Sequence, residues 1–172
     1  MSMDLEKLYS YHTDKSQLFG SEIYPYKKFF AHLPERARTL EEEGEILNQR
    51  LEEMIRIMPH PDKDVEKFII TPNNYSADLV IPYATQVLKK RWPEGEQAII
   101  NDDDAFSARH YAHMFNARIP ELEQLIMQSP EQAFYYAIDT LESRWPEAEK
   151  YIKQDEGVWQ EYMDVWGIDE SI

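Results

Sequence analysis

Three consecutive aspartates, Asp102, Asp103 and Asp104, stand shortly before two histidines, His110 and His113. Carboxylate oxygens and imidazole nitrogens bind divalent metal ions, so this segment is a candidate metal site. Asp104, however, is placed to cap the helix that follows, and the two histidines lack a defined carboxylate partner. We therefore expect a solvated loop here and no bound metal.

Pairs of glutamates are the other candidates for chemistry: Glu94/Glu96, Glu121/Glu123 and Glu147/Glu149. Paired carboxylates can act as general acid and general base. Residues two apart on a helix point to different sides, however, and an active site is normally needed only once. The chain also lacks a Gly-x-x-x-x-Gly-Lys phosphate loop, a Gly-x-Ser-x-Gly elbow and a His-Glu-x-x-His motif. We expect no catalytic residue, no cofactor and no enzyme activity.

The composition limits the class of protein. The 172 residues include 33 acidic and 18 basic side chains, for a formal net charge of −15, and no cysteine. This negative field repels nucleic acid and anionic membranes but attracts basic protein surfaces. The lack of thiols excludes disulfides and fits a reducing cytosol. Because no apolar run or signal-peptide pattern occurs, we expect a protein of the cytoplasm that binds neither nucleic acid nor membrane.

An internal repeat organises the second half of the chain. The pattern Arg-x-Pro-Glu-x-Glu occurs three times, with its arginines 27 and 26 residues apart, and a Tyr-Ala pair precedes each arginine by seven or eight residues. The residues expected to carry this structural repeat are Tyr83, Arg91, Trp92, Tyr111, Arg118, Tyr136, Arg144 and Trp145. A fixed period of this kind is typical of stacked helical units.

Each copy is predicted to fold as two helices. The residues seven positions before the repeat tyrosines, and before a further tyrosine at 162, are good helix N-caps: Ser76, Asp104, Ser129 and Asp155. The first helix should end near the arginine, and the proline should open a shorter second helix. Pro82 departs from the pattern and should kink its helix or delay its start. The arginines should tie a glutamate of an adjacent copy or cover helix-end carbonyls.

One such unit cannot bury its apolar face alone, whereas stacked units can. We therefore predict an all-α fold, a right-handed α-solenoid of helix pairs of about 26–30 residues. Residues 1–61, an aromatic-rich segment plus a long amphipathic helix, and residues 62–172, the helical-repeat region, should pack together as one domain. The long helix is expected from Pro34 to Met58, where apolar residues follow helical spacing. It either caps the solenoid or pairs across a homodimer.

Two segments resemble known proteins. "YATQVLKKRWPEGEQAI" and "YYAIDTLESRWPEAEKYI" resemble a tandem helical repeat of bacteriophage proteins of unassigned function. The similarity runs from Glu66 to Trp166, and the middle copy departs from it by having Ile119 in place of tryptophan. It implies a phage origin and the bacterial host cytoplasm, and it implies no reaction. "YHTDKSQLFGSEIYPYKKFF", from Tyr11 to Phe30, resembles the Tyr-x-Thr-Asp-Lys opening segment of some methyltransferase-like proteins, but no glycine-rich loop follows it.

These observations favour a non-enzymatic phage protein that binds a host or phage protein with a basic surface and modulates host machinery or defence. The candidate partner contacts are aromatic and acidic residues on one solenoid face: Phe134, Tyr135, Trp159, Asp102 and Asp103. Two alternatives stay open. One is an acidic nucleic-acid mimic that inhibits a host DNA- or RNA-binding enzyme, and the other is a small enzyme that uses the segment from Tyr11 to Lys15.

Overall fold

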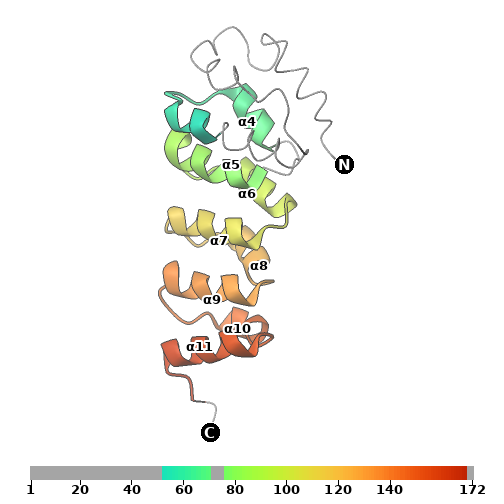
Figure 1. The fold of residues 1–172 in the computed structure, drawn as a ribbon, viewed down its shortest axis with the longest axis vertical. Helices are drawn as coiled ribbons and strands as arrows, with labels where there is room; N and C mark the ends of the chain where they lie inside the picture. Colours follow the sequence, from blue (N-terminus) through green and yellow to red (C-terminus); the bar gives the residue numbers. More distant parts are fainter. Residues whose placement is uncertain (1–51, 71–75, 170–172) are drawn as a thin grey trace, which may run out of the picture. The chain divides into compact units, whose positions relative to one another are not determined.

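The computed structural model describes residues 52–70 and 76–169 (Figure 1). Residues 52–57 are helical, and the elements that follow are α4 (Lys63–Ile70), α5 (Ser76–Pro82), the π-helix η2 (Tyr83–Leu88), α6 (Pro93–Asn101), α7 (Ala105–Met114), α8 (Pro120–Ile126), α9 (Pro130–Asp139), α10 (Pro146–Ile152) and α11 (Glu156–Trp166). The two described ranges contain no β-strand, which confirms the predicted all-α class for this part of the chain.

The chain divides into two compact units, Met1–Ala98 and Ile99–Ile172. The boundary falls within α6. The predicted division at residue 61, with both regions packed as one domain, stays a prediction. Most of the helix predicted from Pro34 to Met58 lies outside the described residues, as does the whole segment from Tyr11 to Lys15. The described end of that helix stops before Pro59, as predicted.

The first unit buries one apolar face of each described helix. α4 packs against α5, and α5 continues directly into η2. Ile69 of α4 and Leu79 of α5 are buried, with at most 1% of their surface exposed. Tyr83 opens η2 and is fully buried, and its ring contacts Trp92 with the ring centroids 5.3 Å apart. The first repeat tyrosine is therefore part of this core.

Pro82 marks a change in helix type. α5 ends at Pro82, and the chain continues without a break as the wider π-helix η2. Proline has no N–H to donate, and its ring collides with the carbonyl four residues earlier, so the tighter α-helical hydrogen bonding cannot continue through it. The hydroxyl of Thr85 donates to the Ile81 carbonyl at 2.7 Å next to this irregular turn. The helix begins at Ser76, so its start is not delayed, and it widens into a π-helix after Pro82. The predicted kink stays a prediction.

Gly95 of α6 is a position of close approach in the first unit. A Cβ atom built there would lie 2.5 Å from Cε3 of Trp92 and 2.8 Å from Cγ1 of Val80. Gly95→Ala should therefore lower the free energy of unfolding by about 1–2 kcal/mol, because the cost of overpacking exceeds the gain in helix propensity. Urea denaturation followed by circular dichroism measures the change.

Gly157 of α11 provides the matched control for Gly95. A Cβ there would meet only Oδ1 of Asp155, at an ordinary 3.4 Å. Gly157→Ala should raise the free energy of unfolding by about 0.5 kcal/mol, because alanine lowers the entropy of the unfolded chain. Equal effects of the two substitutions would show that the contact at Gly95 is not a constraint.

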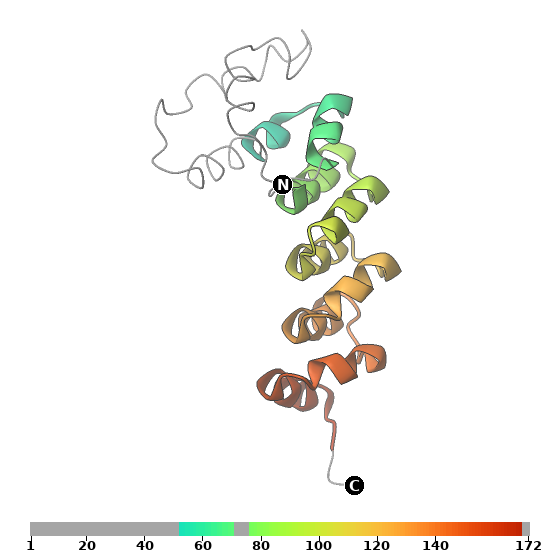
Figure 2. The same cartoon turned by 90° about the vertical axis from the view of Figure 1, so that its right-hand side faces the viewer.

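The second unit repeats one arrangement of helices. α7 packs on α8 and α9, and α9 in turn packs on α10 and α11. Figures 1 and 2 both show α7, α9 and α11 side by side, with α8 and α10 set against them from one side. Ala112 and Ala137, which follow the repeat tyrosines, are fully buried, so only a methyl group separates the backbone from the neighbouring side chains.

Three of the four predicted N-caps are confirmed, whereas Ser76 is itself the first residue of α5 and not the residue before it. The side-chain oxygens of Asp104, Ser129 and Asp155 accept backbone N–H groups in the first turns of α7, α9 and α11. The second helix of each pair, α6, α8 or α10, begins at the proline of the repeat motif. Capping and proline geometry depend only on a few adjacent residues, so the sequence alone specifies these boundaries.

A left-handed backbone position precedes each repeat arginine by two residues. Lys89, Asn116 and Glu142 have φ angles of 53°, 43° and 48°. Lys89 closes η2 in this conformation, with its N–H donating to the Ala84 carbonyl. A residue with a Cβ loses about 1–2 kcal/mol in this region, although asparagine tolerates it better than most. The turn between the paired helices is therefore strained most where lysine and glutamate occupy it.

Glu142→Gly should raise the free energy of unfolding by about 1 kcal/mol. Glycine removes the Cβ clash at positive φ, and this gain exceeds its larger entropy loss on folding. The Glu142 side chain is exposed, so little other interaction is lost. Asn116→Gly is the control and should give a smaller gain in the same urea titration. A loss of stability in Glu142→Gly would contradict the proposed strain.

Candidate functional site

Each repeat arginine forms an ion pair within its own copy. The Nε atoms of Arg91 and Arg118 donate to Oε1 of Glu96 and Glu123 at 2.8 Å in both cases, and their second donors reach Oε2 at 2.8 and 3.0 Å. In the third copy, Arg144 donates to Oε1 of the glutamate at 149 at 2.9 and 2.7 Å. The arginine lies just before the proline and the glutamate lies in the first helical turn, which sets this spacing of five residues.

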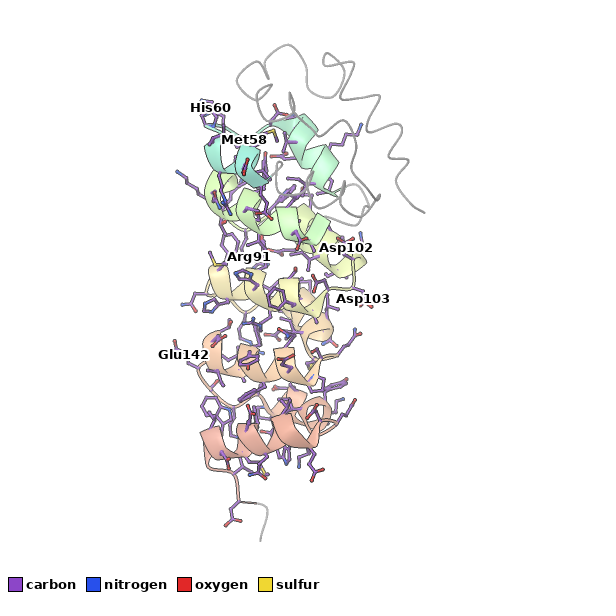
Figure 3. The ribbon with its side chains drawn as sticks, viewed as in Figure 1. Met58, His60, Arg91, Asp102, Asp103 and Glu142 are labelled. Carbon is purple, nitrogen blue, oxygen red and sulfur yellow. The ribbon has the colours of Figure 1, made fainter. Side chains whose placement is uncertain are left out.

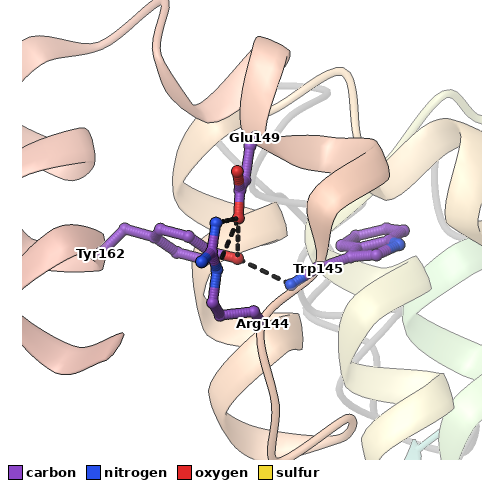
Figure 4. A network of polar contacts seen from close by, with 4 residues as sticks. All are labelled: Arg144, Trp145, Glu149 and Tyr162. Atoms are coloured by element: carbon purple, nitrogen blue, oxygen red, sulfur yellow. Dashed lines mark hydrogen bonds and ion pairs between the residues drawn. The ribbon is translucent and has the colours of Figure 1, made fainter. Parts of the chain in front are cut away.

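In the second unit, the glutamate of each arginine pair also accepts a hydrogen bond from a tyrosine of the next copy. The Tyr136 hydroxyl donates to Oε1 of Glu123 at 3.0 Å, and the Tyr162 hydroxyl donates to Oε1 of Glu149 at 3.3 Å. Tyr162 also accepts the backbone N–H of Trp145 at 2.7 Å (Figure 4). Both tyrosines are fully buried, so these bonds tie each copy to the one after it inside the core.

The first unit contains a further Tyr–Glu hydrogen bond, and here the glutamate has no repeat arginine before it. The Tyr83 hydroxyl donates to Oε1 of Glu66 at 3.3 Å and accepts the backbone N–H of Asp62 at 2.9 Å. Counting back five residues from the glutamate, the position of the repeat arginine, gives Pro61. Residues 61–66 therefore keep the glutamate that bonds to the tyrosine, while proline stands in place of the arginine and Lys63 in place of the motif proline.

Electrostatics fix the protonation state of this network. Burial raises the pKa of Tyr83 and Tyr136 well above the ordinary value for a phenol, and it also raises the pKa of Tyr162. Hydrogen bonds to their glutamates raise the pKa of Arg118 and Arg144. The hydroxyls thus keep their protons and the guanidiniums keep their charge at neutral pH. The network can tie helices together, but these donors do not exchange protons near neutral pH.

The arginine partners differ from the sequence expectation. We expected each arginine either to reach a glutamate of an adjacent copy or to cover helix-end carbonyls. The glutamate that it binds belongs to the same copy, and the tyrosine makes the connection between copies. The repeat positions are otherwise occupied by core residues: Tyr83, Tyr111, Tyr136 and Ile119 are 0% exposed, and Trp92 and Trp145 are 6% and 2% exposed. The side chains of the repeat motif therefore make their contacts within the protein.

The three aromatic candidates for partner contact differ in exposure. Phe134 and Trp159 are buried, with 4% and 8% of their surface exposed, and both rings pack against Tyr162, so the expectation that they face a partner is corrected. Tyr135 is 39% exposed.

The acidic candidates lie at one edge of the second unit. Asp103 is exposed and Asp102 half-buried, beside the first turn of α7 (Figure 3). Glu142 lies at the opposite edge of this unit, after the end of α9. The candidate aromatic and acidic residues are therefore not gathered at one point.

The aspartate and histidine segment forms no recognisable metal site. Asp104 uses its carboxylate to cap α7, accepting the N–H groups of Phe106 and Ser107. No group of three or more histidine or acidic side chains in residues 52–70 and 76–169 is arranged to hold a metal ion. Over the same residues, no helix has the length and apolar character that crossing a membrane requires.

The second unit carries a large excess of negative charge. Its arginines are all paired with carboxylates of the same unit: Arg109 with Asp139 at 3.0 Å, Arg118 with Glu123 at 2.8 Å and Arg144 with Glu149 at 2.7 Å. Many other acidic side chains of this unit are exposed: Asp103, Glu121, Glu131, Glu142, Glu147, Glu156, Glu161 and Asp164. Because the arginines are compensated internally and Lys150 and Lys153 are the only lysines of this unit, the more numerous acids dominate the surface potential.

An exposed aromatic site on α7 and α9 was missed by sequence reasoning. The guanidinium carbon of Arg109 lies 5.5 Å from the ring centroid of Phe106 and 5.6 Å from that of Tyr135, so both rings border one cation. Its Nε donates to Gln132 at 2.8 Å, and a terminal nitrogen donates to Asp139 at 3.0 Å. We call Phe106, Arg109 and Tyr135 the α7–α9 aromatic site.

The sequence did contain a signal for the α7–α9 aromatic site. Phe106 stands two residues after its N-cap, where the later copies have Glu131 and Gly157. A large aromatic residue at an otherwise polar or small position of a repeat indicates a feature of that copy alone. In the structure Phe106 is 54% exposed, so it does not serve the common core.

Comparisons with known proteins give no further constraint on the site. No protein-family model matches the chain, and neither a curated protein nor a solved structure does.

Proposed function

We propose that this protein is a non-enzymatic helical-repeat protein that binds a protein partner through a basic surface of that partner. The observation that carries the proposal is the internal compensation of the arginines in the second unit, at Asp139, Glu123 and Glu149. The exposed carboxylates are left to define the field outside the molecule. Such a field accelerates association with basic surfaces and opposes association with nucleic acid.

A right-handed α-solenoid is the architecture that we propose for the repeat region. The tandem packing of α7 to α11 supports it, as do the equivalent burial of the repeat tyrosines and the equivalent Tyr–Glu bonds between copies. Stacked repeats of this kind present extended surfaces whose composition can vary while the core stays constant.

The partner that we propose is a host or phage protein in the bacterial cytoplasm, whose machinery or defence role the binding modulates. The likeness between the Tyr-Ala and Arg-Trp-Pro-Glu repeat and that of bacteriophage helical-repeat proteins supports this setting. The repeat motif itself offers no reactive group, since its arginines, glutamates and tyrosines are occupied by one another.

Affinity purification of the tagged full chain from bacterial cells, at low and at physiological salt, tests the proposal. We expect a stoichiometric basic partner whose affinity, measured again with both proteins purified, falls as salt rises. A variant with Glu121, Glu142 and Glu147 all changed to glutamine removes three charges from the summed field and should bind this partner more weakly. Recovery of no stoichiometric partner at either salt concentration would overturn the proposal. Displacement of the partner by DNA would instead favour the nucleic-acid mimic.

A further inference from the structure

The outer faces of α7 and α9 carry two stripes of exposed or half-exposed residues. The α7 stripe consists of residues spaced four apart: Phe106, His110 and Met114. The α9 stripe has the same spacing and consists of Glu131, Tyr135 and Asp139. Residues four apart lie one above the other on a helix surface. The α7 stripe is largely apolar, with Phe106 54% and Met114 49% exposed, and the α9 stripe places a ring between two acids.

The two stripes belong to one surface. α7 packs against α9, and Arg109 lies between the rings of Phe106 and Tyr135. His113 further joins the helices, with Nδ1 3.1 Å from the carbonyl oxygen of Asp139. The rings are therefore held in place by the fold, and a partner would meet them without having to order them first.

The positive charge of this surface is already compensated. The Arg109 side chain is only 15% exposed and is paired with Asp139. Burial and then the neighbouring Arg109 lower the pKa of His110, whose ring lies 6.0 Å from that of Phe106, so it is neutral at pH 7. Glu131 is exposed, one turn from Tyr135. The surface thus combines apolar rings with uncompensated negative charge.

We propose that this surface, formed by the α7 stripe and the α9 stripe, binds a basic amphipathic segment of a protein partner. The apolar side chains of the partner segment cover Phe106 and Met114. The lysines or arginines of the segment lie against Tyr135 and pair with Glu131. The inference rests on the proposed function and assigns it to a surface. A second copy of this chain is a poor occupant, because two surfaces of the same negative charge would repel each other in a chain of net charge −15.

A labelled 18-residue peptide of lysine and leucine in helical alternation is the probe, titrated into the full chain by fluorescence anisotropy. The double variant Phe106→Ala/Tyr135→Ala should bind roughly tenfold more weakly, because two exposed aromatic contacts are lost. Glu131→Gln should bind about threefold more weakly. Both rings are exposed, so the fold should persist, and thermal unfolding followed by circular dichroism verifies this.

Matched controls separate the surface from general charge. Glu147→Gln removes the same charge from α10, and Ile57→Ala shortens a side chain that is 47% exposed on another helix. Both variants should bind the peptide with an affinity within twofold of that of the unchanged protein. Equal binding by the double variant and the unchanged protein would overturn the inference and leave the proposed function standing.

Two further outcomes also decide the question. If the unchanged protein ignores the peptide but a basic partner is recovered from cells, only the surface assignment fails; if neither binds, the proposed function fails as well. Analytical ultracentrifugation of the free protein adds the last test. A dimer that the double variant abolishes would make a second copy the occupant and overturn the inference.

Discussion

Trp145→Ala should lower the free energy of unfolding by about 3–5 kcal/mol, the largest effect we expect from a single substitution. The Trp145 side chain is 2% exposed, and its ring lies 4.9 Å from that of Tyr136, centroid to centroid. Truncation removes a large apolar surface and leaves a cavity beside that ring. The backbone hydrogen bond from Trp145 to Tyr162 does not depend on the side chain, so the loss reports packing alone. Urea denaturation of the full chain measures it.

The middle copy supplies the control for this prediction. Ile119 occupies the position equivalent to Trp145 and is fully buried there. Trp145→Ile should therefore lose less than the alanine variant, since part of the cavity is filled by a side chain that the same motif accepts elsewhere. A loss below about 1 kcal/mol in Trp145→Ala would show that the interface between copies collapses around the gap.

The boundaries of the helices were predictable because they depend on adjacent residues. Asp104, Ser129 and Asp155 cap helices with their own side chains, and each repeat proline opens the next helix. The ends of the first helices were placed only roughly. Lys89 and Glu142 turn the chain there in the left-handed region, and neither residue type signals positive φ as glycine would.

The buried aromatic residues were only partly assigned, although the repeat contains the information. Trp159 stands four residues after its N-cap, where the earlier copies have the buried Ala108 and Ala133. Aligning the copies by their caps would have placed Trp159 in the core. Phe134 and Tyr135 are neighbours of similar character, so composition alone could not decide which of them faces solvent.

The connection between copies depends on the tertiary structure, and the sequence shows only its spacing. Tyr136 follows Glu123 by 13 residues and Tyr162 follows Glu149 by the same interval, but this regularity does not say that the side chains meet. Whether an arginine reaches its own glutamate or that of a neighbour depends on the turn before the proline. The α7–α9 aromatic site likewise needs two helices in contact, so no single segment could predict it.

Glu123→Ala is the second substitution for which we expect a large effect. It should lower the free energy of unfolding by about 2–4 kcal/mol. Glu123 is 8% exposed and accepts both donors of Arg118 and the hydroxyl of Tyr136. Its removal leaves a fully buried hydroxyl without its carboxylate acceptor, while the Arg118 side chain, 59% exposed, can return to water. The loss should therefore be smaller than for a fully buried ion pair.

A double-mutant cycle with Tyr136→Phe isolates the bond that links the copies. The Tyr136→Phe background removes the hydroxyl, so Glu123→Ala should cost about 1–2 kcal/mol less there than in the unchanged protein. Glu66 gives the matched comparison in the first unit: it accepts from Tyr83 with Pro61 in the arginine position, so Glu66→Ala should cost less than Glu123→Ala. Additive losses in the cycle would mean that the Tyr–Glu bond contributes nothing to holding adjacent copies together. A coupling near the expected value would instead identify this bond as the element by which each copy stabilises the next.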